Sequence, residues 1–360
     1  LLAGSTAGRP VVLASSSLRR CIARGRELIG WERKFPRVRI DADRVRGCGM
    51  AVSMQGSGIA GVDTASVLLK LNDDGWFTLS HAATDMGQGS DTVLAQIAAE
   101  VLEVELGRIV VASFDLDTLP YDGGAYASSG AYVTGRATLE AAGDMVLQVR
   151  ATAAGMLGVP ADEVRYAGGV CTAADGREVG LEALARRLAS FAGRGQLVSV
   201  GTFGSATSPP PFMAGFAEVE VDLRTGAVRL IDFVAVADCG RVLNPNLARL
   251  QAEGGLVMGI GLALCEEVRE NARGALTTDS FLEYRIPSRL DVPPVRVEFV
   301  ESEEPTGPFG AKSIGEIGCN TPAPAIAAAV ANAVGVHCRR LPITAEQVFL
   351  ALHGGRMRED

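Results

Sequence analysis

Apolar and polar residues alternate along this chain at two different spacings, which predict its helices and its strands. Residues 18–31 carry apolar side chains at roughly helical spacing, with Arg and Glu between them, and this pattern predicts an amphipathic helix. A basic, extended connector follows over residues 33–46. Three runs then have the composition of strands, at 49–54, 65–71 and 76–80, and an Asn-Asp-Asp-Gly turn joins the last two as a hairpin.

The same order of elements occurs twice in the chain. The first half continues with a predicted helix, strand and long helix at 91–106, 109–114 and 133–157. After a glycine-rich stretch with little pattern come a predicted hairpin, helix, strand and helix, at 216–222, 228–237, 246–262, 295–300 and 323–334. We therefore predict an α+β fold of two similar α/β units that share a hairpin-helix-strand-helix pattern without apparent sequence identity.

These patterns divide the chain into four segments. They are an N-terminal helix and connector, a first α+β unit, a boundary region, and a second α+β unit with a glutamate-bearing loop, predicted at 1–46, 47–170, 171–207 and 208–360. The boundary is placed where hydrophobic patterning is weakest and glycine is frequent. Each unit is long enough to bury a core of its own.

Charge and hydropathy narrow the kinds of partner. The 360 residues carry a formal net charge of -8, whereas binding to nucleic acid or to an anionic membrane requires clustered Lys and Arg. Uninterrupted apolar runs fall short of the roughly 18 residues that a membrane span requires, so we expect no span and interpret 254–264 and 324–334 as buried helices. The first residues lack the pattern of a secretory signal, and the missing initiator Met suggests a processed or trimmed piece.

The seven cysteines are odd in number and scattered along the chain. No two have the C-x-x-C spacing that is typical of zinc and iron–sulfur sites. This usage predicts reduced, mostly buried thiols in a cytoplasmic protein and no metal ligands from this chain. Iron–sulfur clusters, if the protein works with them, are therefore expected on another chain.

Four glycine-rich polar loops interrupt the predicted elements, and such interruptions often mark functional sites. In the first loop, residues 85–92, Gly87 and Gly89 precede a helix whose N-terminus carries a partial positive charge. The pattern fits an anion site, with backbone N–H groups pointing outward, as well as it fits a turn capped by Ser90 or Asp91. It is not a P-loop, because no Gly-Lys-Ser/Thr follows.

The next two loops also precede predicted helices. Small and hydroxyl residues fill the second loop, 122–130, and the apolar elements on both sides argue against a flexible linker. The third loop, 238–245, ends in Asn244 and Pro245, a natural cap and a favoured first helical residue. These two residues need no ligand to explain them, and a solvated helix face would explain Gln251, a few residues further on.

The fourth loop, residues 307–318, contains a glutamate between glycines. Glu316 has Ile314 and Ile317 as apolar neighbours, and an apolar setting disfavours a charged carboxylate, which suits a general base near neutral pH. Lys312, four residues earlier, could equally well neutralise the carboxylate in a structural ion pair. From the residues alone, the structural interpretation of Glu316 is favoured.

Taken in order, these loops resemble the molybdenum-binding domains of the xanthine dehydrogenase and aldehyde oxidase family. The matching motifs are Gly-Gln-Gly, the loop 126–130 with the Thr-Gly-Arg-Ala after it, Gly-Arg-x-x-Asn-Pro with a later Gln-Ala-Glu-Gly, and Gly-Ala-Lys-x-x-Gly-Glu. The ending, from Pro-Ala-Pro-Ala-Ile to Leu-Pro-Ile-Thr, is also similar to the family's C-terminus. Five short motifs in the right order, over about residues 21–350, make the resemblance specific.

The resemblance implies a bound molybdopterin, in bacteria often the cytosine dinucleotide form. Its dithiolene holds the molybdenum together with oxo, hydroxo and sulfido or selenido groups, without a protein ligand. Carried over residue by residue, the cofactor contacts fall on Gly87, Gln88, Gly89, Ala127, Ser128, Ser129, Gly130 and Gln251. Glu316 corresponds to the catalytic base that takes the proton of the Mo–OH group, whose oxygen attacks an electrophilic carbon.

The implied function is a molybdenum-dependent oxidoreductase that hydroxylates a purine, a nicotinate-like heterocycle or an aldehyde with water as the oxygen source. A further family portion, with a Gly-Gly-Phe-Gly-Gly-like loop and substrate-selecting residues, is not apparent here. We therefore expect a heteromeric complex with a subunit that carries this portion, and with 2Fe-2S and FAD subunits; an expression fragment is the alternative. Two other functions stay open: a non-catalytic assembly subunit of the same fold, and a nucleotide- or phosphate-binding protein that uses the Gly87–Gly89 loop.

Overall fold

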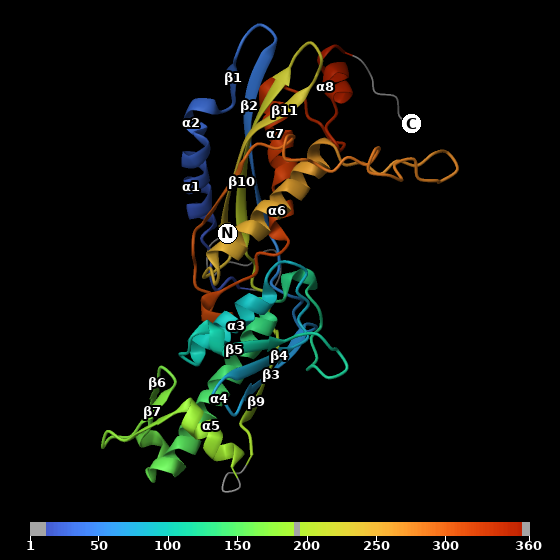
Figure 1. Cartoon of the computed structure of the whole chain (residues 1–360). Helices are drawn as coiled ribbons and strands as arrows, with labels where there is room; N and C mark the ends of the chain where they lie inside the picture. The colour runs from blue at the N-terminus through green and yellow to red at the C-terminus, as the bar shows by residue number, and fades with distance from the viewer. Residues whose placement is uncertain (1–11, 191–194, 355–360) are drawn as a thin grey trace. The chain divides into compact units, whose positions relative to one another are not determined.

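The computed structural model describes residues 12–190 and 195–354, which form two compact units (Figure 1). Unit 1 combines three chain segments, Leu1–Gln55, Pro210–Glu303 and Ile314–Asp360. Unit 2 combines Gly56–Pro209 with the short segment Glu304–Ser313. Each unit is a β-sheet with helices packed on it, so the predicted α+β class is confirmed.

The sheet of unit 1 has the strand order β1-β2-β10-β11-β12. Its strands are β1 (Arg37–Arg39), β2 (Arg44–Met54), β10 (Phe212–Asp222), β11 (Val228–Asp238) and β12 (Val295–Phe299). The central strand β10 pairs antiparallel with β2 and β11, and β11 pairs parallel with β12. The carboxyl ends of β2, β11 and β12 therefore lie at the same edge of this sheet.

Helices cover both faces of the unit 1 sheet (Figure 1). They are α1 (Leu18–Ile29), α2 (Trp31–Lys34), α6 (Pro245–Leu264), α7 (Pro322–Val334) and α8 (Ala345–Leu352). The amphipathic α1 packs its buried Cys21 and Ile29 on Phe216 of β10. On the opposite face, apolar residues of α6 and α7 form the larger core with β10 and β11.

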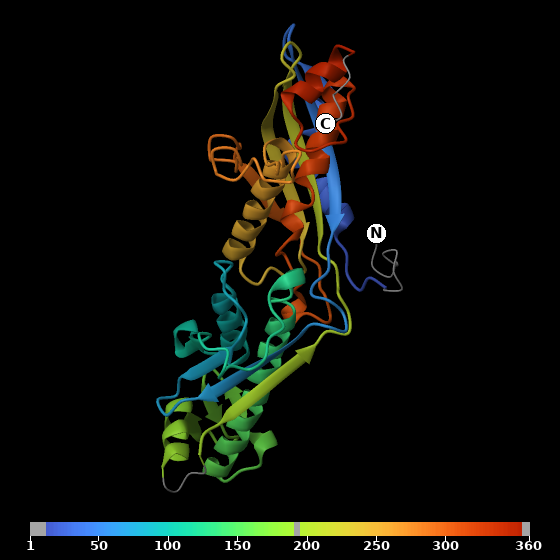
Figure 2. The same cartoon turned by 90° about the vertical axis from the view of Figure 1, so that its right-hand side faces the viewer.

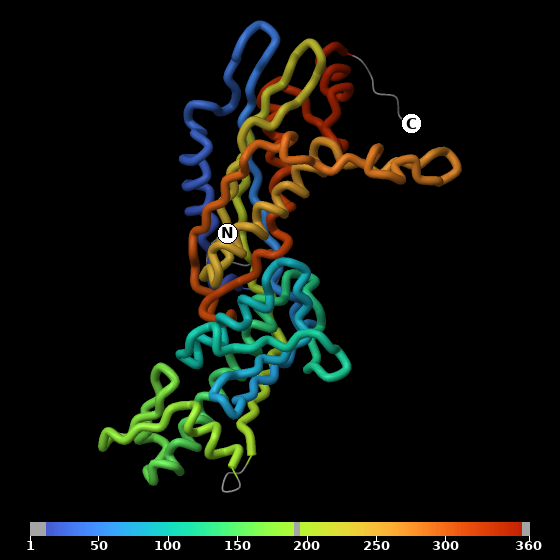
Figure 3. Tube along the Cα trace, viewed as in Figure 1, coloured from blue at the N-terminus to red at the C-terminus, as the bar shows by residue number. Residues whose placement is uncertain are grey.

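A long segment without regular structure, residues 265–294, connects α6 to β12 and extends from unit 1 as the orange loop in Figure 3. Only an isolated bridge between Glu270 and Leu276 interrupts it. Several of its apolar side chains are exposed, with fractions of 83% for Phe281, 85% for Leu282 and 96% for Leu290. We call this segment the arm.

The main sheet of unit 2 has the order β5-β4-β3-β9. Its strands are β3 (Thr64–Leu71), β4 (Phe77–His81), β5 (Ile109–Ala112) and β9 (Val198–Gly204). The hairpin β3–β4 is antiparallel, β5 is parallel to β4, and β9 lies antiparallel beside β3 (Figure 2). A small second sheet consists of β6 (Arg165–Ala167), β7 (Val170–Thr172) and β8 (Glu178–Gly180).

The helices of unit 2 are α3 (Ser90–Val101), α4 (Val133–Leu157) and α5 (Leu181–Ala189), with short 3₁₀ turns η1 (Leu106–Arg108), η2 (Tyr126–Ser128), η3 (Ala161–Glu163) and η4 (Pro308–Gly310). The long helix α4 packs on β3 and β9. Tyr132, just before α4, is fully buried and donates its hydroxyl hydrogen to Thr306 at 2.8 Å. This bond joins the segment Glu304–Ser313 to the rest of unit 2.

In both units a helix packs directly on strand backbone, at positions where the strand has a glycine. A Cβ atom on Gly47 of β2 would approach the carbonyl oxygen of Ala329 in α7 to less than 3.0 Å, a distance that real Cβ atoms do not show. A Cβ atom on Gly201 of β9 would meet the carbonyl oxygen of Ala137 in α4 in the same way. These two glycines permit the close helix–strand contact of each unit.

The structure corrects several predicted boundaries. The helix predicted at 91–106 ends at Val101, and the connector predicted at 33–46 contains α2, β1 and the start of β2. The divisions 1–46, 47–170, 171–207 and 208–360 also differ from the two units, since β2 joins the sheet of the second half. The predicted boundary region contains β8, α5 and β9. It is part of unit 2 and not a boundary, because β9 pairs with β3 over seven residues.

Helix α6 also departs from prediction. By length and composition alone it is the described helix that meets the criterion for a membrane span, whereas we expected none. Ala252, Leu256 and Ile260 are buried in the core of unit 1, but Met258 and Leu262 are exposed. The expectation of a buried helix is thus correct for one face of α6.

Candidate functional site

Each unit gathers the predicted loops at the edge where its parallel strands end. In unit 1 the third glycine-rich loop follows β11, and the end of the fourth loop, from Ile314 to Gly318, also belongs to this unit. In unit 2 the loops after β4 and β5 contain the first and second. Ligands of α/β sheets commonly bind beyond the carboxyl ends of the strands, so both edges are candidate binding surfaces. The predicted residues Glu316 and Gln251 belong to unit 1, and the other seven belong to unit 2.

The first loop is organised around the Asp85 carboxylate. Its Oδ1 accepts hydrogen bonds from the backbone N–H groups of Gly87 at 2.8 Å and Gly89 at 3.2 Å, and Oδ2 accepts from Asp91 N–H at 3.3 Å. Of the two interpretations left open for this loop, these bonds contradict outward-pointing N–H groups, and α3 also lacks the side-chain cap that the other expected from Ser90 or Asp91. Asp85 holds both glycines and the start of α3, which explains why a carboxylate belongs at this position.

Hydrogen bonding also fixes the charge of Asp85. Burial alone would raise the pKa of this carboxyl group, but the N–H groups of Gly87, Gly89 and Asp91 hold it below its ordinary value. The loop thus carries a permanent negative charge near neutral pH. The Gln88 side chain folds back within the loop, where Oε1 accepts from Met86 N–H at 2.6 Å and Nε2 donates to the Thr84 carbonyl at 2.8 Å.

A buried histidine lies beneath this loop, at the end of β4. His81 is fully buried, and its Nε2 lies 3.5 Å from Oδ1 of Asp91, which in turn accepts a hydrogen bond from Ser113 through Oδ2 at 3.0 Å. Burial lowers the pKa of His81, although the nearby charges of Asp91, Asp122 and Asp85 oppose that effect. His81 is therefore a neutral imidazole at neutral pH.

The second loop has a strained backbone. Ala127 and Ser128 have φ angles of 50° and 58°, in the left-handed region that non-glycine residues rarely adopt. The Ala127 carbonyl accepts from Gly58 N–H at 2.9 Å, and the Ser129 hydroxyl donates to the Gly124 carbonyl at 2.6 Å. Two consecutive strained residues are typical of functional loops, so this finding supports the second loop as part of a site.

In unit 1, two glutamines contact the loop that contains Glu316. Gln55, directly after β2, donates from Nε2 to Oε2 of Glu316 at 2.6 Å. Gln251 of α6 donates from Nε2 to the Gly315 carbonyl at 2.6 Å. The backbone N–H and the thiol of Cys319 both donate to the Glu316 carbonyl, at 3.2 Å and 3.0 Å. Both the carboxylate and the backbone of this residue are thereby positioned.

The structure corrects the expected surroundings of Glu316. Ile317 is buried, but Glu316 itself is exposed, so the described residues do not enclose the carboxylate in an apolar pocket. Lys312, the alternative ion-pair partner, is itself buried. Gln251 is predicted to bind the cofactor, and the structure adds a second role: its side chain holds the backbone of the Glu316 loop.

The third loop acts as a structural element, as its residues predicted. Asn244 accepts a hydrogen bond from Leu247 N–H at 3.1 Å and caps α6, and Pro245 is the first helical residue. Asp238, fully buried at the end of β11, accepts hydrogen bonds from Ser17 N–H and the Ser302 hydroxyl, both at 2.6 Å. These bonds hold the loops after β11 and β12 together.

The unit 2 edge has open space beside its glycines. A Cβ atom added to Gly87 or Gly130 would meet nothing within 4 Å, so a ligand can approach the backbone there. Among the described residues no group of His, Cys, Asp and Glu could hold a metal ion. Open backbone, small hydroxyl residues and the N-terminus of α4 fit a pterin with phosphate groups that brings its own metal ligands.

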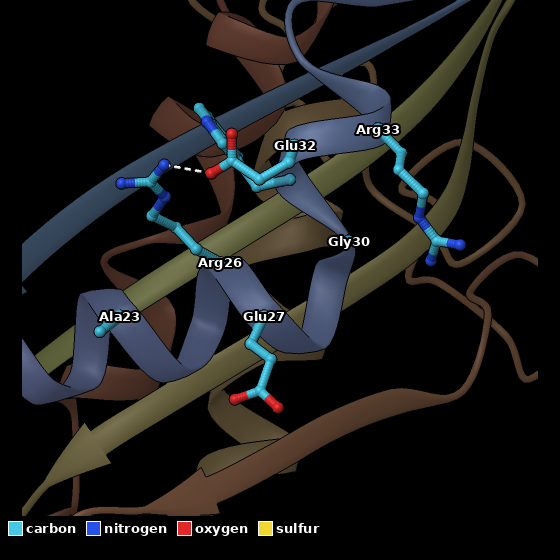
Figure 4. A pocket seen from close by; sticks show the side chains of 7 residues that line it. Ala23, Arg26, Glu27, Gly30, Glu32 and Arg33 are labelled. Atoms are coloured by element: carbon cyan, nitrogen blue, oxygen red, sulfur yellow. Dashed lines mark hydrogen bonds and ion pairs between the residues drawn. The ribbon is translucent and has the colours of Figure 1, made fainter.

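A surface pocket of about 470 Å³ lies elsewhere, at the corner between α1 and α2 (Figure 4). Its lining includes Arg26, Trp31 and Arg33 but none of the predicted site residues. In Figure 4 the Arg26 side chain pairs with Glu32, and Arg33 points to the other side. This pocket is separate from both loop edges.

The fold and the two loop edges define an α+β protein with glycine-rich loops at the carboxyl ends of its parallel strands. A family model described as a molybdopterin cofactor-binding domain matches residues 24–334. This chain therefore belongs to the molybdopterin-binding region of the xanthine dehydrogenase and aldehyde oxidase family, as the resemblance predicted.

Relatives and solved structures agree with this assignment. The chain is 39% identical over 341 residues to the probable hypoxanthine oxidase XdhD of Escherichia coli K12, covering 94% of this chain and 35% of that protein. It is 34% identical to the xanthine dehydrogenase molybdenum-binding subunit of Escherichia coli O157:H7, covering 94% and 46%. The crystal structure of quinoline 2-oxidoreductase from Pseudomonas putida 86 matches with a TM-score of 0.87 at 26% identity, covering 96% and 47%. The chain thus spans less than half the length of each.

Three residues of these edges did not stand out in the sequence. His81 is the last residue of β4, Gln55 directly follows β2, and Asp85 lies four residues beyond the end of β4. The position alone, a polar residue after a predicted parallel strand, could have identified Gln55 and Asp85. His81 lacked such a signal, because a single histidine at the end of a strand is compatible with many roles.

Proposed function

We propose that this chain is the molybdopterin-binding, catalytic part of a molybdenum hydroxylase, with Glu316 as its general base. The observation that carries the proposal is the arrangement around Glu316: a carboxylate held by Gln55, on a loop tied to α6 by Gln251, in a chain of this family. The substrate class we propose is a purine, a nicotinate-like heterocycle or an aldehyde, hydroxylated with water as the oxygen source.

The two edges have different proposed roles. Gly87, Gln88, Gly89 and the loop from Ala127 to Gly130 bind the cofactor, through open backbone and small side chains. Gln251 completes this set and also positions the loop of the base. When bound, the cofactor supplies the molybdenum, which activates water-derived oxygen and accepts the electrons of the substrate. Glu316 accepts the proton at its carboxylate, which a hydrogen bond from Gln55 orients.

The proposed cofactor is molybdopterin in its cytosine dinucleotide form. The proposed complex also contains 2Fe-2S and FAD subunits, which remove the electrons, and a subunit that carries the portion of the family not found in this chain. The name of the Escherichia coli O157:H7 relative, a molybdenum-binding subunit, supports a complex of several subunits. We propose the cytoplasm as its location, and the seven free cysteines, four of them buried, support this.

The arm supports the proposal of a protein partner. Phe281, Leu282 and Leu290 are almost fully exposed, and contiguous exposed apolar residues are typical of protein interfaces. The occupant we propose is the polypeptide that makes up the rest of the relatives' length, since the matched region is only 46% and 47% of those proteins. A photo-crosslinker in place of Leu282 should join this polypeptide in the native complex; a crosslink to a second copy of this chain would contradict the assignment.

The decisive experiment compares Glu316→Gln and Glu316→Ala with the unchanged chain in the purified native complex. Both variants should retain stoichiometric molybdenum and lose turnover by roughly 10²- to 10⁴-fold, the usual contribution of a general base. Hypoxanthine, xanthine, nicotinate and benzaldehyde are the substrates to test. Glu303→Gln, an exposed glutamate of the same connection, should turn over normally.

Two alternative functions give different results in this experiment. Unchanged turnover of a molybdenum-loaded Glu316→Ala complex would favour the non-catalytic assembly subunit. Binding of mononucleotides by the isolated chain would favour the nucleotide- or phosphate-binding protein, and absence of binding at millimolar ligand would exclude it. The internal hydrogen bonds from Gly87 and Gly89 to Asp85 argue against this second alternative, because they occupy the N–H groups that a phosphate would need.

A further inference from the structure

The hydrogen bond between Gln55 and Glu316 joins residues far apart in the sequence. Gln55 Nε2 lies 2.6 Å from Glu316 Oε2, and both residues belong to unit 1. A short hydrogen bond from an amide to a carboxylate is among the stronger polar contacts that proteins make. The bond acts on the side chain of Glu316, whereas Gln251 and Cys319 act on the backbone of its loop.

The sheet fixes where Gln55 lies. Strand β2 pairs with β10 along its whole length, and its last residue, Met54, faces the buried Phe212. Gln55 is the next residue, at the edge where β11 and β12 also end. Its backbone therefore starts from a rigid point, while the Glu316 loop follows the end of β12. A well-placed donor can thus restrict an otherwise exposed carboxylate.

The neighbouring titratable group does not disturb this arrangement. Burial raises the pKa of the Cys319 thiol, and the charge of Glu316 adds to the effect. Cys319 therefore stays protonated near neutral pH and donates to the Glu316 carbonyl. An amide does not titrate, so Gln55 also remains a donor at every working pH.

We propose that Gln55 is a positioning residue for Glu316: its amide holds a carboxylate oxygen and thereby fixes the orientation of the base. The inference rests on the proposed role of Glu316 and adds a residue that the sequence motifs do not contain. Gln55 touches neither substrate nor cofactor in this assignment. It acts through the geometry of the base.

The test uses the native complex with Gln55→Met, which keeps the side-chain length but removes the donor. We expect kcat to fall by about 10- to 100-fold, the value of one hydrogen bond to a charged group, with KM within about twofold and molybdenum content unchanged. Gln347→Met is the matched control. Gln347 donates from Nε2 to the Pro342 carbonyl in the same unit, so this variant loses an equivalent bond remote from the Glu316 loop and should keep its kcat.

A second variant separates positioning from a general structural effect. Gln55→Glu places two carboxylates face to face, and such pairs share one proton. The acid limb of its kcat/KM profile should therefore move to higher pH by about one unit or more, whereas a structural defect would lower kcat/KM equally at every pH.

Two results would overturn the inference. One is a Gln55→Met complex with normal kcat, and the other is a Gln55→Glu profile that keeps its shape. Either result, combined with an inactive Glu316→Gln complex, would remove Gln55 and leave the proposed function standing. If Glu316→Gln is fully active, the proposed function itself fails, so the two failures are distinguishable.

Discussion

The two units have the same framework but different chemistry at equivalent edges. In each unit a hairpin, a helix, a strand parallel to the second hairpin strand and a second helix follow one another, giving the orders β12-β11-β10-β2 and β5-β4-β3-β9. The seventh residue of the first helix is glutamine in both, Gln96 in α3 and Gln251 in α6. Yet the unit 1 edge carries Gln55 and Glu316, and the unit 2 edge carries glycines and serines.

This difference teaches that the framework positions loops and leaves their chemistry free to vary. The unit 2 edge is suited to close approach of a ligand. Its charged Asp85 carboxylate already accepts hydrogen bonds from the backbone of its own loop. The unit 1 edge offers a carboxylate that Gln55 holds by a hydrogen bond. We propose that the unit 2 edge mainly binds the cofactor and that the unit 1 edge carries out the proton transfer.

The units also differ in where the fourth strand of the sheet, β2 or β9, lies in the sequence. In unit 1 the strand β2 precedes the hairpin in the sequence, and in unit 2 the strand β9 follows the last helix. Both strands pack their glycines against the last helix, α7 or α4, so the same contact is built from opposite ends of the repeat. The helix-to-strand connection differs most, since residues 102–108 suffice in unit 2 where unit 1 has the arm.

The largest predicted effect comes from filling the glycine contact of unit 2. Gly201→Val would place a branched side chain where even a Cβ atom meets the backbone of Ala137 and Ala141 at less than 3.0 Å. Because helix backbone cannot yield as a flexible side chain can, we expect unit 2 to lose its fold. The measurement is thermal unfolding by circular dichroism, with soluble yield as a second readout.

The matched control is Gly143→Ala, in the same helix that covers Gly201. A Cβ atom on Gly143 would meet nothing within 4 Å, and alanine favours a helix over glycine by about 1 kcal/mol. This variant should be as stable as the unchanged chain or more so. A stable Gly201→Val chain would show that the glycine contact is not what unites the fourth strand with α4.

The second-largest predicted effect is loss of bound cofactor without loss of turnover per bound molybdenum. Asp85→Asn replaces a carboxylate that accepts three backbone hydrogen bonds by an amide whose single oxygen cannot accept them all. The native complex should lose molybdopterin by several-fold, while turnover per bound molybdenum stays near normal. The measurement is pterin and molybdenum content after gel filtration, set beside activity.

Two comparisons sharpen the result for Asp85. Asp74→Asn, in the turn between β3 and β4 where the carboxylate accepts from Trp76 N–H, should retain the cofactor. Glu316→Gln should give the opposite pattern, full molybdenum and lost turnover. An Asp85→Asn complex with full cofactor and poor turnover would contradict the division of roles between the edges.

Hydrophobic patterning predicted most of the framework, because the repeated elements bury regular apolar faces. The helix at 133–157 was predicted with the bounds of α4, and the order hairpin, helix, strand, helix is confirmed in both units. Strand β9 was missed for a physical reason. Its buried positions are the small Ser199 and Gly201, which face α4, and its exposed positions include Val200, so the usual pattern is inverted.

The site was predictable in part. Glycine motifs located all four loops, and family resemblance supplied the candidate residues that local pattern could not. The sequence does not reveal which distant segments come together. Gln55 and Glu316 meet because β2 and β12 end at one edge, and that depends on the strand order. The role of Asp85 within its own loop was missed because glycine N–H groups were expected to serve a ligand.

The smallest predicted effect concerns pH and the buried His81 of unit 2. Its pKa is lowered chiefly by burial, and an unfolded histidine titrates near ~6.5. As the pH falls below that value, the unfolded chain takes up a proton that the folded unit does not, so stability is present above this pH and is lost below it. The thermal midpoint should therefore decrease between pH 7.5 and pH 5.5.

His81→Asn removes this titration and should flatten the decrease, even if it lowers the midpoint at both pH values by leaving space in the core. His337→Asn, at an exposed histidine of unit 1, should keep the original pH dependence. Differential scanning calorimetry at the two pH values measures both variants. An unchanged slope in His81→Asn would mean that the imidazole takes up its proton in the folded unit as readily as in the unfolded chain.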